Sequence, residues 1–133
     1  MEPEPVKACL DTHAVLWSLA GDPRLGPEAR GLIAHSKRPD LIISDTVLLE
    51  ISYLSAKGRI EDAEGIDALL AKVAESFRVI PISPEIARIA LELDFPHGDP
   101  FDRVIIATAK IHSVPLLTRD RSITASGSVK TLW

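Results

Sequence analysis

Short apolar runs alternate with amphipathic segments along this 133-residue chain, and this alternation is what most constrains its fold. The runs are rich in Val, Ile and Leu, which is typical of strands that are buried on both faces of a sheet. They occupy residues 6–10, 41–43, 78–82, 114–118 and 129–132. Between them, apolar residues recur at helical spacing within 14–20, 27–36, 45–57, 66–77 and 101–113. The pattern predicts a three-layer α/β fold, in which helices cover both faces of a mostly parallel sheet of four to five strands.

Three helix starts carry local signals of their own. Ser83-Pro84 and Asp99-Pro100 each place a side-chain acceptor directly before a proline, which suits an N-cap followed by the first helical position. Ser44 can cap the helix over 45–57, which should end near Gly58. These signals fix where helices begin without fixing how the helices pack.

Length and charge exclude several classes of protein. The length suits one domain over 1–133, with a disordered tail at 1–5. The formal net charge is −4, so there is no overall basic field to attract nucleic acid, and any contact with RNA or DNA needs a local site. The single cysteine, Cys9, excludes an internal disulfide and a cysteine-rich zinc site, which favours the reducing cytoplasm. No apolar run approaches the roughly 20 residues of a membrane span, so we expect no contact with membrane.

Two acidic residues directly follow predicted strands. Asp11 comes after the run over 6–10, and Asp120 comes after the run over 114–118. In parallel sheets, ligands bind beyond the carboxyl ends of the strands, so both residues stand where a site is expected. Each also has a simpler interpretation, Asp11 as a helix N-cap and Asp120 as a turn aspartate.

Two further acids share a helix face with apolar residues. Glu50 lies on or beside the stripe of Val47 and Leu54, and an isolated carboxylate there needs a partner or a metal. It could instead reach solvent at the edge of the stripe, or pair with Lys57 or an arginine. Asp102 lies in the first helical turn and shares a face with the isoleucines that follow it. A favourable interaction with the helix dipole would also explain Asp102, with Asp99 as the cap.

Brought together, Asp11, Glu50, Asp102 and Asp120 would repel one another strongly unless a divalent cation neutralised them. All-oxygen ligation suits one or two ions of Mg²⁺ or Mn²⁺. Such ions activate water and stabilise charge on phosphate, so phosphodiester hydrolysis is the chemistry expected. Arg103 and Arg119 lie beside these acids in the sequence and could bind the substrate, although a solvated surface charge is the more common role for any single arginine.

At this point the residues resemble the PIN-domain ribonucleases, and within them the VapC-type toxins of bacterial toxin–antitoxin pairs. The likeness covers nearly the whole chain, and the order of its short motifs makes it specific. In order they are Leu-Asp-Thr-His over 10–13, Glu50 on a helix, Asp-Pro-Phe-Asp-Arg-Val-Ile-Ile-Ala over 99–107, Leu-Thr-Arg-Asp over 117–120 and Val-Lys-Thr-Leu-Trp over 129–133.

The resemblance implies a PIN-like fold with a central parallel sheet, cleavage of RNA that depends on Mg²⁺ or Mn²⁺, inhibition by a cognate antitoxin, and a homodimer. Carried over residue by residue, Asp11, Glu50, Asp102 and Asp120 match the four metal-binding acids of the family. Asp99 is an additional acid, which either caps its helix or lies in the outer shell of the metal. His13 is common in this branch and receives no role.

Three hypotheses therefore stand. The first is a metal-dependent endoribonuclease that is the toxin of a type II toxin–antitoxin system. The second keeps the acids but changes the substrate, giving another Mg²⁺-dependent phosphodiesterase, a phosphatase or a DNA nuclease. The third is a non-catalytic binding module of the same fold, in which the acids only cap helices.

Overall fold

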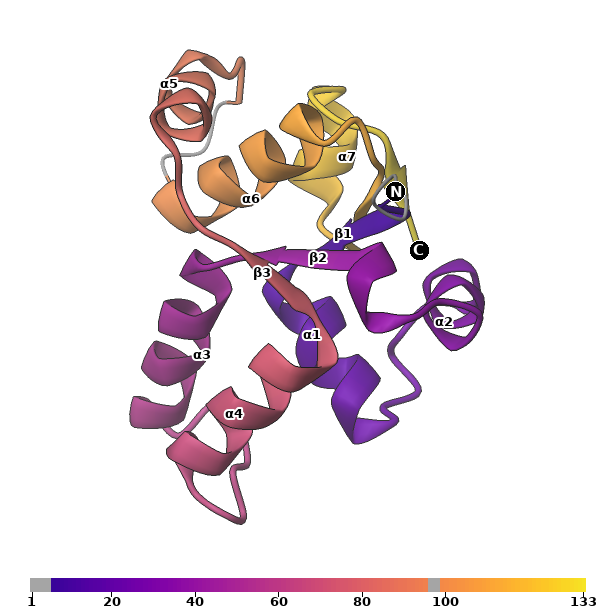
Figure 1. Ribbon diagram of the computed structural model, residues 1–133, viewed down its shortest axis with the longest axis vertical. Helices are drawn as coiled ribbons and strands as arrows, with labels where there is room; N and C mark the ends of the chain where they lie inside the picture. The colour runs from indigo at the N-terminus through magenta and orange to yellow at the C-terminus, as the bar shows by residue number, and fades with distance from the viewer. Residues whose placement is uncertain (1–5, 96–98) are drawn as a thin grey trace, which may run out of the picture.

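The protein is described by a computed structural model over residues 6–95 and 99–133 (Figure 1). The tail expected at 1–5 lies outside the described residues. In chain order the elements are β1 (Ala8–Leu10), α1 (Thr12–Ala20), α2 (Pro27–Ala34), a 3-10 turn η1 (Arg38–Asp40), β2 (Leu41–Ser44), α3 (Thr46–Ala56), α4 (Ile66–Ser76), β3 (Arg78–Ile80), α5 (Pro84–Glu92), α6 (Pro100–Ile111), β4 (Leu116–Leu117), α7 (Arg121–Ser126) and β5 (Thr131–Leu132).

The described strands form one parallel sheet in the order β3-β2-β1-β4-β5. In its centre, Cys9 of β1 lies opposite Ile42 of β2 and Leu116 of β4. Figure 1 shows α5, α6 and α7 on one side of the sheet, with α1, α3 and α4 on the other. The three-layer α/β prediction is therefore confirmed, and the sheet has the upper number of strands expected.

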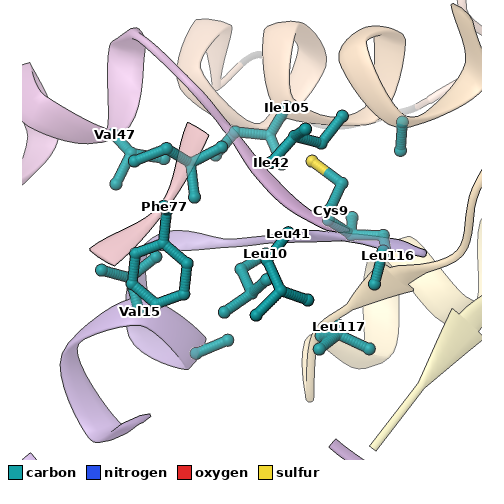
Figure 2. Close-up of a cluster of buried hydrophobic side chains, with 14 of the residues drawn as sticks. Cys9, Leu10, Val15, Leu41, Ile42, Val47, Phe77, Ile105, Leu116 and Leu117 are labelled. Atoms are coloured by element: carbon teal, nitrogen blue, oxygen red, sulfur yellow. The ribbon is translucent and has the colours of Figure 1, made fainter. Parts of the chain in front are cut away.

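Side chains of the central strands alternate between the two faces of the sheet. Figure 2 shows Cys9 and Ile42 on the side of Ile105 in α6, whereas Leu10 lies on the side of Val15 in α1. All of these side chains are buried. Burial also raises the pKa of the Cys9 thiol, so this cysteine is inert packing material. Since both faces are apolar, polar chemistry must lie at an edge of the sheet.

Two of the three capping predictions are confirmed at the atoms expected. Ser83 Oγ accepts a hydrogen bond from the Ile86 amide at 3.1 Å, and Asp99 Oδ1 accepts one from the Phe101 amide at 2.9 Å. At α3 the prediction is off by one residue, because the N-cap is Asp45 rather than Ser44; Ser44 Oγ still accepts a hydrogen bond from the Thr46 amide at 3.1 Å. Prolines at the first turn of α5 and α6 complete these starts.

Two short elements have no counterpart in the predictions, η1 and α7. Helix α7 spans six residues, and among them only Ile123 is buried, so it has no apolar repeat to recognise. It matters because it begins directly after Asp120. Among the residues described, no helix combines the length and apolar character that a membrane crossing requires.

Candidate active site

The carboxyl ends of β1 and β4 deliver two aspartates to one edge of the sheet. Asp11 follows β1, and its Oδ1 accepts a hydrogen bond from the Ala14 amide at 2.9 Å, capping α1. Asp120 caps α7, and its Oδ1 accepts from the amides of Ser122 at 2.8 Å and Ile123 at 3.2 Å. Asp120 is therefore an N-cap rather than a plain turn residue. In both cases the helix start fixes one carboxylate oxygen and thereby aims the other.

Thr118 links these two aspartates. Its buried hydroxyl oxygen accepts a hydrogen bond from the Asp120 amide at 3.0 Å. The same side chain also makes a hydrogen bond with the Asp11 carboxylate that lowers the pKa of that group. Because Thr118 directly follows β4, the sheet itself sets the separation of Asp11 and Asp120.

Glu50 reaches the same edge from α3. Val47 and Ile51 are fully buried, and Glu50 is half-buried beside them, as expected for a residue next to the apolar stripe. Its Oε1 accepts a short hydrogen bond from the hydroxyl of Thr12, the first residue of α1. Within the part of the chain that the structure describes, no ion pair involves Glu50, so pairing with Lys57 is not observed.

The N-terminus of α6 contributes Asp99 and Asp102. Asp99 is the exposed N-cap, as expected, and Asp102 is half-buried in the first turn. Both line a cavity of about 970 Å³, which is also lined by Asp11, Glu50 and Asp120. These five carboxylates, among the acids that line the cavity, come from separate parts of the chain and include all four acids that the sequence singled out.

The convergence is visible in the acid–base behaviour of these groups. Burial, and after it the negative charges of Asp99, Glu50, Asp120 and Asp11, together raise the pKa of Asp102 to about 7. Burial likewise raises the pKa of Asp11, and Glu50 adds to the effect, whereas Thr118, the Ala14 amide and His13 oppose it. These carboxylates are close enough to disfavour each other's charged form.

No ion pair within the described chain joins any of these five carboxylates to a cationic side chain. The ion pairs found there are Lys7–Asp40, Arg24–Asp22 and Arg88–Glu92, and none of them uses Asp11, Glu50, Asp99, Asp102 or Asp120. Within residues 6–95 and 99–133, no three His, Cys, Asp or Glu side chains lie close enough together to form a ready metal-binding group. The donor set nevertheless fits Mg²⁺ or Mn²⁺ chemically, since it offers only carboxylate oxygens and these ions accept water as remaining ligands.

The two arginines predicted to bind the substrate make different contacts in the structure. Arg103 Nη1 donates to the carbonyls of Ala90 at 3.1 Å and Leu93 at 3.3 Å, and Nη2 donates to that of Phe95. Arg103 therefore ties the end of α5 to α6 and does not line the cavity, because its donors are used by these backbone carbonyls. Arg119 does line the cavity, beside Asp120.

The cavity wall also contains residues for which no site role was predicted. Trp17, Asp22 and Arg24 lie around the end of α1, and Trp133 packs edge-on against Trp17 with ring centroids 5.8 Å apart. No local motif marks them. In the sequence, Trp17 looks like an ordinary apolar residue of a helix. Arg119 is far from it along the chain, and Arg24 follows the turn after α1.

A PIN domain family model matches residues 8–126, and this range contains every acid of the cavity. The chain belongs to the PIN domain family. The resemblance to VapC-type proteins is confirmed by Ribonuclease VapC22 of Mycobacterium tuberculosis, which is 35% identical over 116 residues, covering 86% of this chain and 87% of that protein.

Solved structures share the PIN fold at much lower identity. DNA-bound VapBC from Salmonella typhimurium is similar with a TM-score of 0.73 at 17% identity, covering 96% of this chain and 97% of that one. A toxin–antitoxin complex from Klebsiella pneumoniae gives a TM-score of 0.67 at 20% identity, with 96% and 97% covered. These similarities support the fold. The argument for a site depends on the carboxylates of this chain.

Proposed function

We propose that this PIN-domain protein is a metal-dependent endoribonuclease, the toxin component of a type II toxin–antitoxin system. The observation that carries the proposal is that Asp11, Glu50, Asp99, Asp102 and Asp120 line one cavity, and that none of these five has an ion-pair partner within the described chain. A helix cap acts on its own helix, so a capping role alone does not require these acids to lie close together and raise one another's pKa. The binding-module hypothesis does not account for this arrangement.

In this proposal, Asp11, Glu50, Asp102 and Asp120 hold Mg²⁺ or Mn²⁺ directly or through water, as one or two ions. Asp99 remains the α6 cap and an outer-shell acid. A bound ion would lower the pKa of water and neutralise charge on the phosphate. No histidine or lysine is needed as a general base.

The chain's own residues prepare this centre. The Ala14 amide orients Asp11, and the hydroxyl of Thr12 orients Glu50. The N-terminus of α7 orients Asp120. The pKa of Asp102 is about 7 in the absence of a cation, so its carboxyl group is partly protonated near neutral pH, and a bound cation would favour loss of that proton.

RNA is the substrate we propose, because the 35% identical relative carries the name ribonuclease. DNA and small phosphate esters are the alternatives that the same acids would serve. We also place the protein in the cytoplasm, where RNA is accessible to a nuclease.

Two protein partners belong to the same proposal. The Klebsiella structure is a toxin–antitoxin complex, which supports a cognate antitoxin for this chain. A second copy of the chain suits the outer face of α3, where Leu49 and Tyr53 are each 52% exposed and Tyr53 contacts Phe101 with ring centroids 6.1 Å apart. Leu49 and Tyr53 lie one turn apart on α3, so they form one small apolar patch that a second copy would cover.

The deciding experiment compares substrates with and without the ion. The full chain is incubated with RNA, single-stranded DNA and a small phosphate ester, each in Mg²⁺, in Mn²⁺ and in EDTA. We expect cleavage of RNA that either ion supports and EDTA abolishes. Cleavage of the ester alone would overturn the RNA assignment, and cleavage that persists in EDTA would overturn the metal assignment.

A further inference from the structure

Two arginines lie over the same tryptophan in the cavity wall. The guanidinium carbons of Arg24 and Arg119 are each 4.6 Å from a ring centroid of Trp17. Trp17 is only 8% exposed and is held edge-on by Trp133. A buried aromatic ring in this position restricts the two cationic side chains and favours them electrostatically.

The two arginines differ in how far their donors are used. Arg24 makes a two-point contact with Asp22, from Nε to Oδ1 at 3.0 Å and from Nη2 to Oδ2 at 2.7 Å. Arg119 has no hydrogen-bond or ion-pair partner within residues 6–95 and 99–133, and it is exposed. Its N–H donors are therefore presented to the cavity with nothing from the described chain to accept them.

The cluster of Arg24, Arg119 and Asp22 has one more positive charge than negative charges. Two guanidinium groups face one carboxylate, since Asp22 bonds Arg24 and is also influenced by Arg119. A phosphodiester carries one negative charge, and a guanidinium matches its oxygens with parallel donors. The cluster therefore has the charge and the geometry for one backbone phosphate.

Its position makes that phosphate part of the substrate. Arg119 directly precedes Asp120, and Arg24, Arg119 and Trp17 line the same cavity as the carboxylates. We propose that Arg119, held over Trp17 beside Arg24, binds a non-scissile phosphate of single-stranded RNA next to the cleavage centre. This inference rests on the proposed ribonuclease function and adds a substrate-binding subsite to it.

The subsite recognises the backbone rather than a base. Stacking of a base needs an open aromatic face, as in proteins that bind single strands. The ring of Trp17 is buried and already contacts two arginines, His13 and Trp133. Trp17 is thus a positioning residue, and Arg119 makes the contact.

The test measures RNA binding in EDTA, where the proposed enzyme does not cleave. The probe is a labelled, mixed-sequence, single-stranded RNA of about 12 nucleotides, and anisotropy is recorded over a range of salt. For Arg119→Ala we expect about tenfold weaker binding and a log–log salt slope shallower by about 0.7, the value for one phosphate contact on a single strand. Lys72→Ala is the matched control, because Lys72 lines the same cavity but lies over no aromatic ring of the described residues.

A rescue experiment isolates the role of Arg24. Arg24→Ala leaves Asp22 free to pair with Arg119, so we expect a loss of binding similar to that of Arg119→Ala. The double variant Arg24→Ala/Asp22→Ala removes the competing carboxylate, so binding should recover most of that loss. A cluster that only stabilises the fold would show no such rescue, and thermal unfolding of each variant is measured alongside.

The outcomes separate this inference from the proposed function. Unchanged RNA affinity and salt slope in Arg119→Ala would overturn the inference, even if the wild type cleaves RNA. So would equal losses in Arg119→Ala and Lys72→Ala, which would indicate general attraction by charge. Failure of the wild type to cleave RNA would instead overturn the function. In cleavage assays, Arg119→Ala should raise KM and leave kcat nearly unchanged.

Discussion

The two edges of the parallel sheet treat acidic side chains in opposite ways. At the amino edge, Asp40 precedes β2, accepts the Lys37 amide at 2.8 Å and pairs with Lys7 at 3.4 Å. The Lys37 amide and the charge of Lys7 hold the pKa of Asp40 below its usual range. At the carboxyl edge, Asp11 and Asp102 face other carboxylates, and burial with like charge raises their pKa values.

This difference distinguishes acids that stabilise the fold from acids that are placed to bind a cation. A paired carboxylate stabilises the folded state, whereas crowded carboxylates destabilise it until something positive binds. At the carboxyl edge, the repulsion between the carboxylates is therefore relieved only when a positively charged ligand binds. Substitutions at the two edges should consequently act in opposite directions.

The largest expected contrast is in catalysis. Asp102→Asn should reduce RNA cleavage by at least about 100-fold, because it removes a carboxylate from the proposed ion site. Its melting temperature should be equal to or above that of the wild type, since one repelling charge is gone. Asp40→Asn is the matched control at the amino edge, and it should cleave RNA normally while melting earlier. Full activity in Asp102→Asn would remove the contrast.

The next effect is stabilisation by the divalent ion. At pH 8, Mg²⁺ at about 100 times its dissociation constant should stabilise the fold by about 2.7 kcal/mol, on the order of 5–10 °C in melting temperature. The shift should shrink at pH 5, where the proton on Asp102 competes with the ion. Calorimetry with an EDTA reversal measures it. An equal shift in Asp102→Asn would place the ion elsewhere.

A smaller effect is the pH dependence of stability in EDTA. The pKa of Asp102 is about 7 in the folded protein and near its ordinary value of about 4 when unfolded. Between these values the folded protein holds a proton that the unfolded chain has released, so stability falls as pH rises from about 4 to 7. After allowance for solvent screening we expect a loss of roughly 1–2 kcal/mol by urea unfolding. The curve of Asp102→Asn should be flatter over the same range, and an identical curve would contradict the crowding.

The smallest effect has the opposite sign and belongs to the amino edge. The lowered pKa of Asp40 means that its pairing stabilises the protein above about pH 4, and that this is lost as pH falls through the folded-state value. Asp40→Asn should therefore be less stable than the wild type at pH 7, and the difference should vanish in acid. A difference that persists at low pH would show that packing, rather than charge, is involved.

The sequence by itself determined the architecture and the acids. Alternating apolar runs and helix signals such as Ser83-Pro84 act within a few residues, so the order of elements and the parallel sheet could be predicted. The positions of Asp11 and Asp120 after strands follow from the same local logic. The chemistry of the acids could be argued from residue type, since carboxylates that meet require a cation.

Only the tertiary structure decided what each polar side chain touches. Arg103 and Arg119 look alike in the sequence, yet one is tied to backbone carbonyls and the other lies over Trp17, which is distant along the chain. Thr12 reaches Glu50 on α3 for the same reason, because packing of α1 against α3 brings them together. Such contacts depend on how whole elements stack through their apolar faces, and no local pattern of residues encodes the partner that a long polar side chain will find.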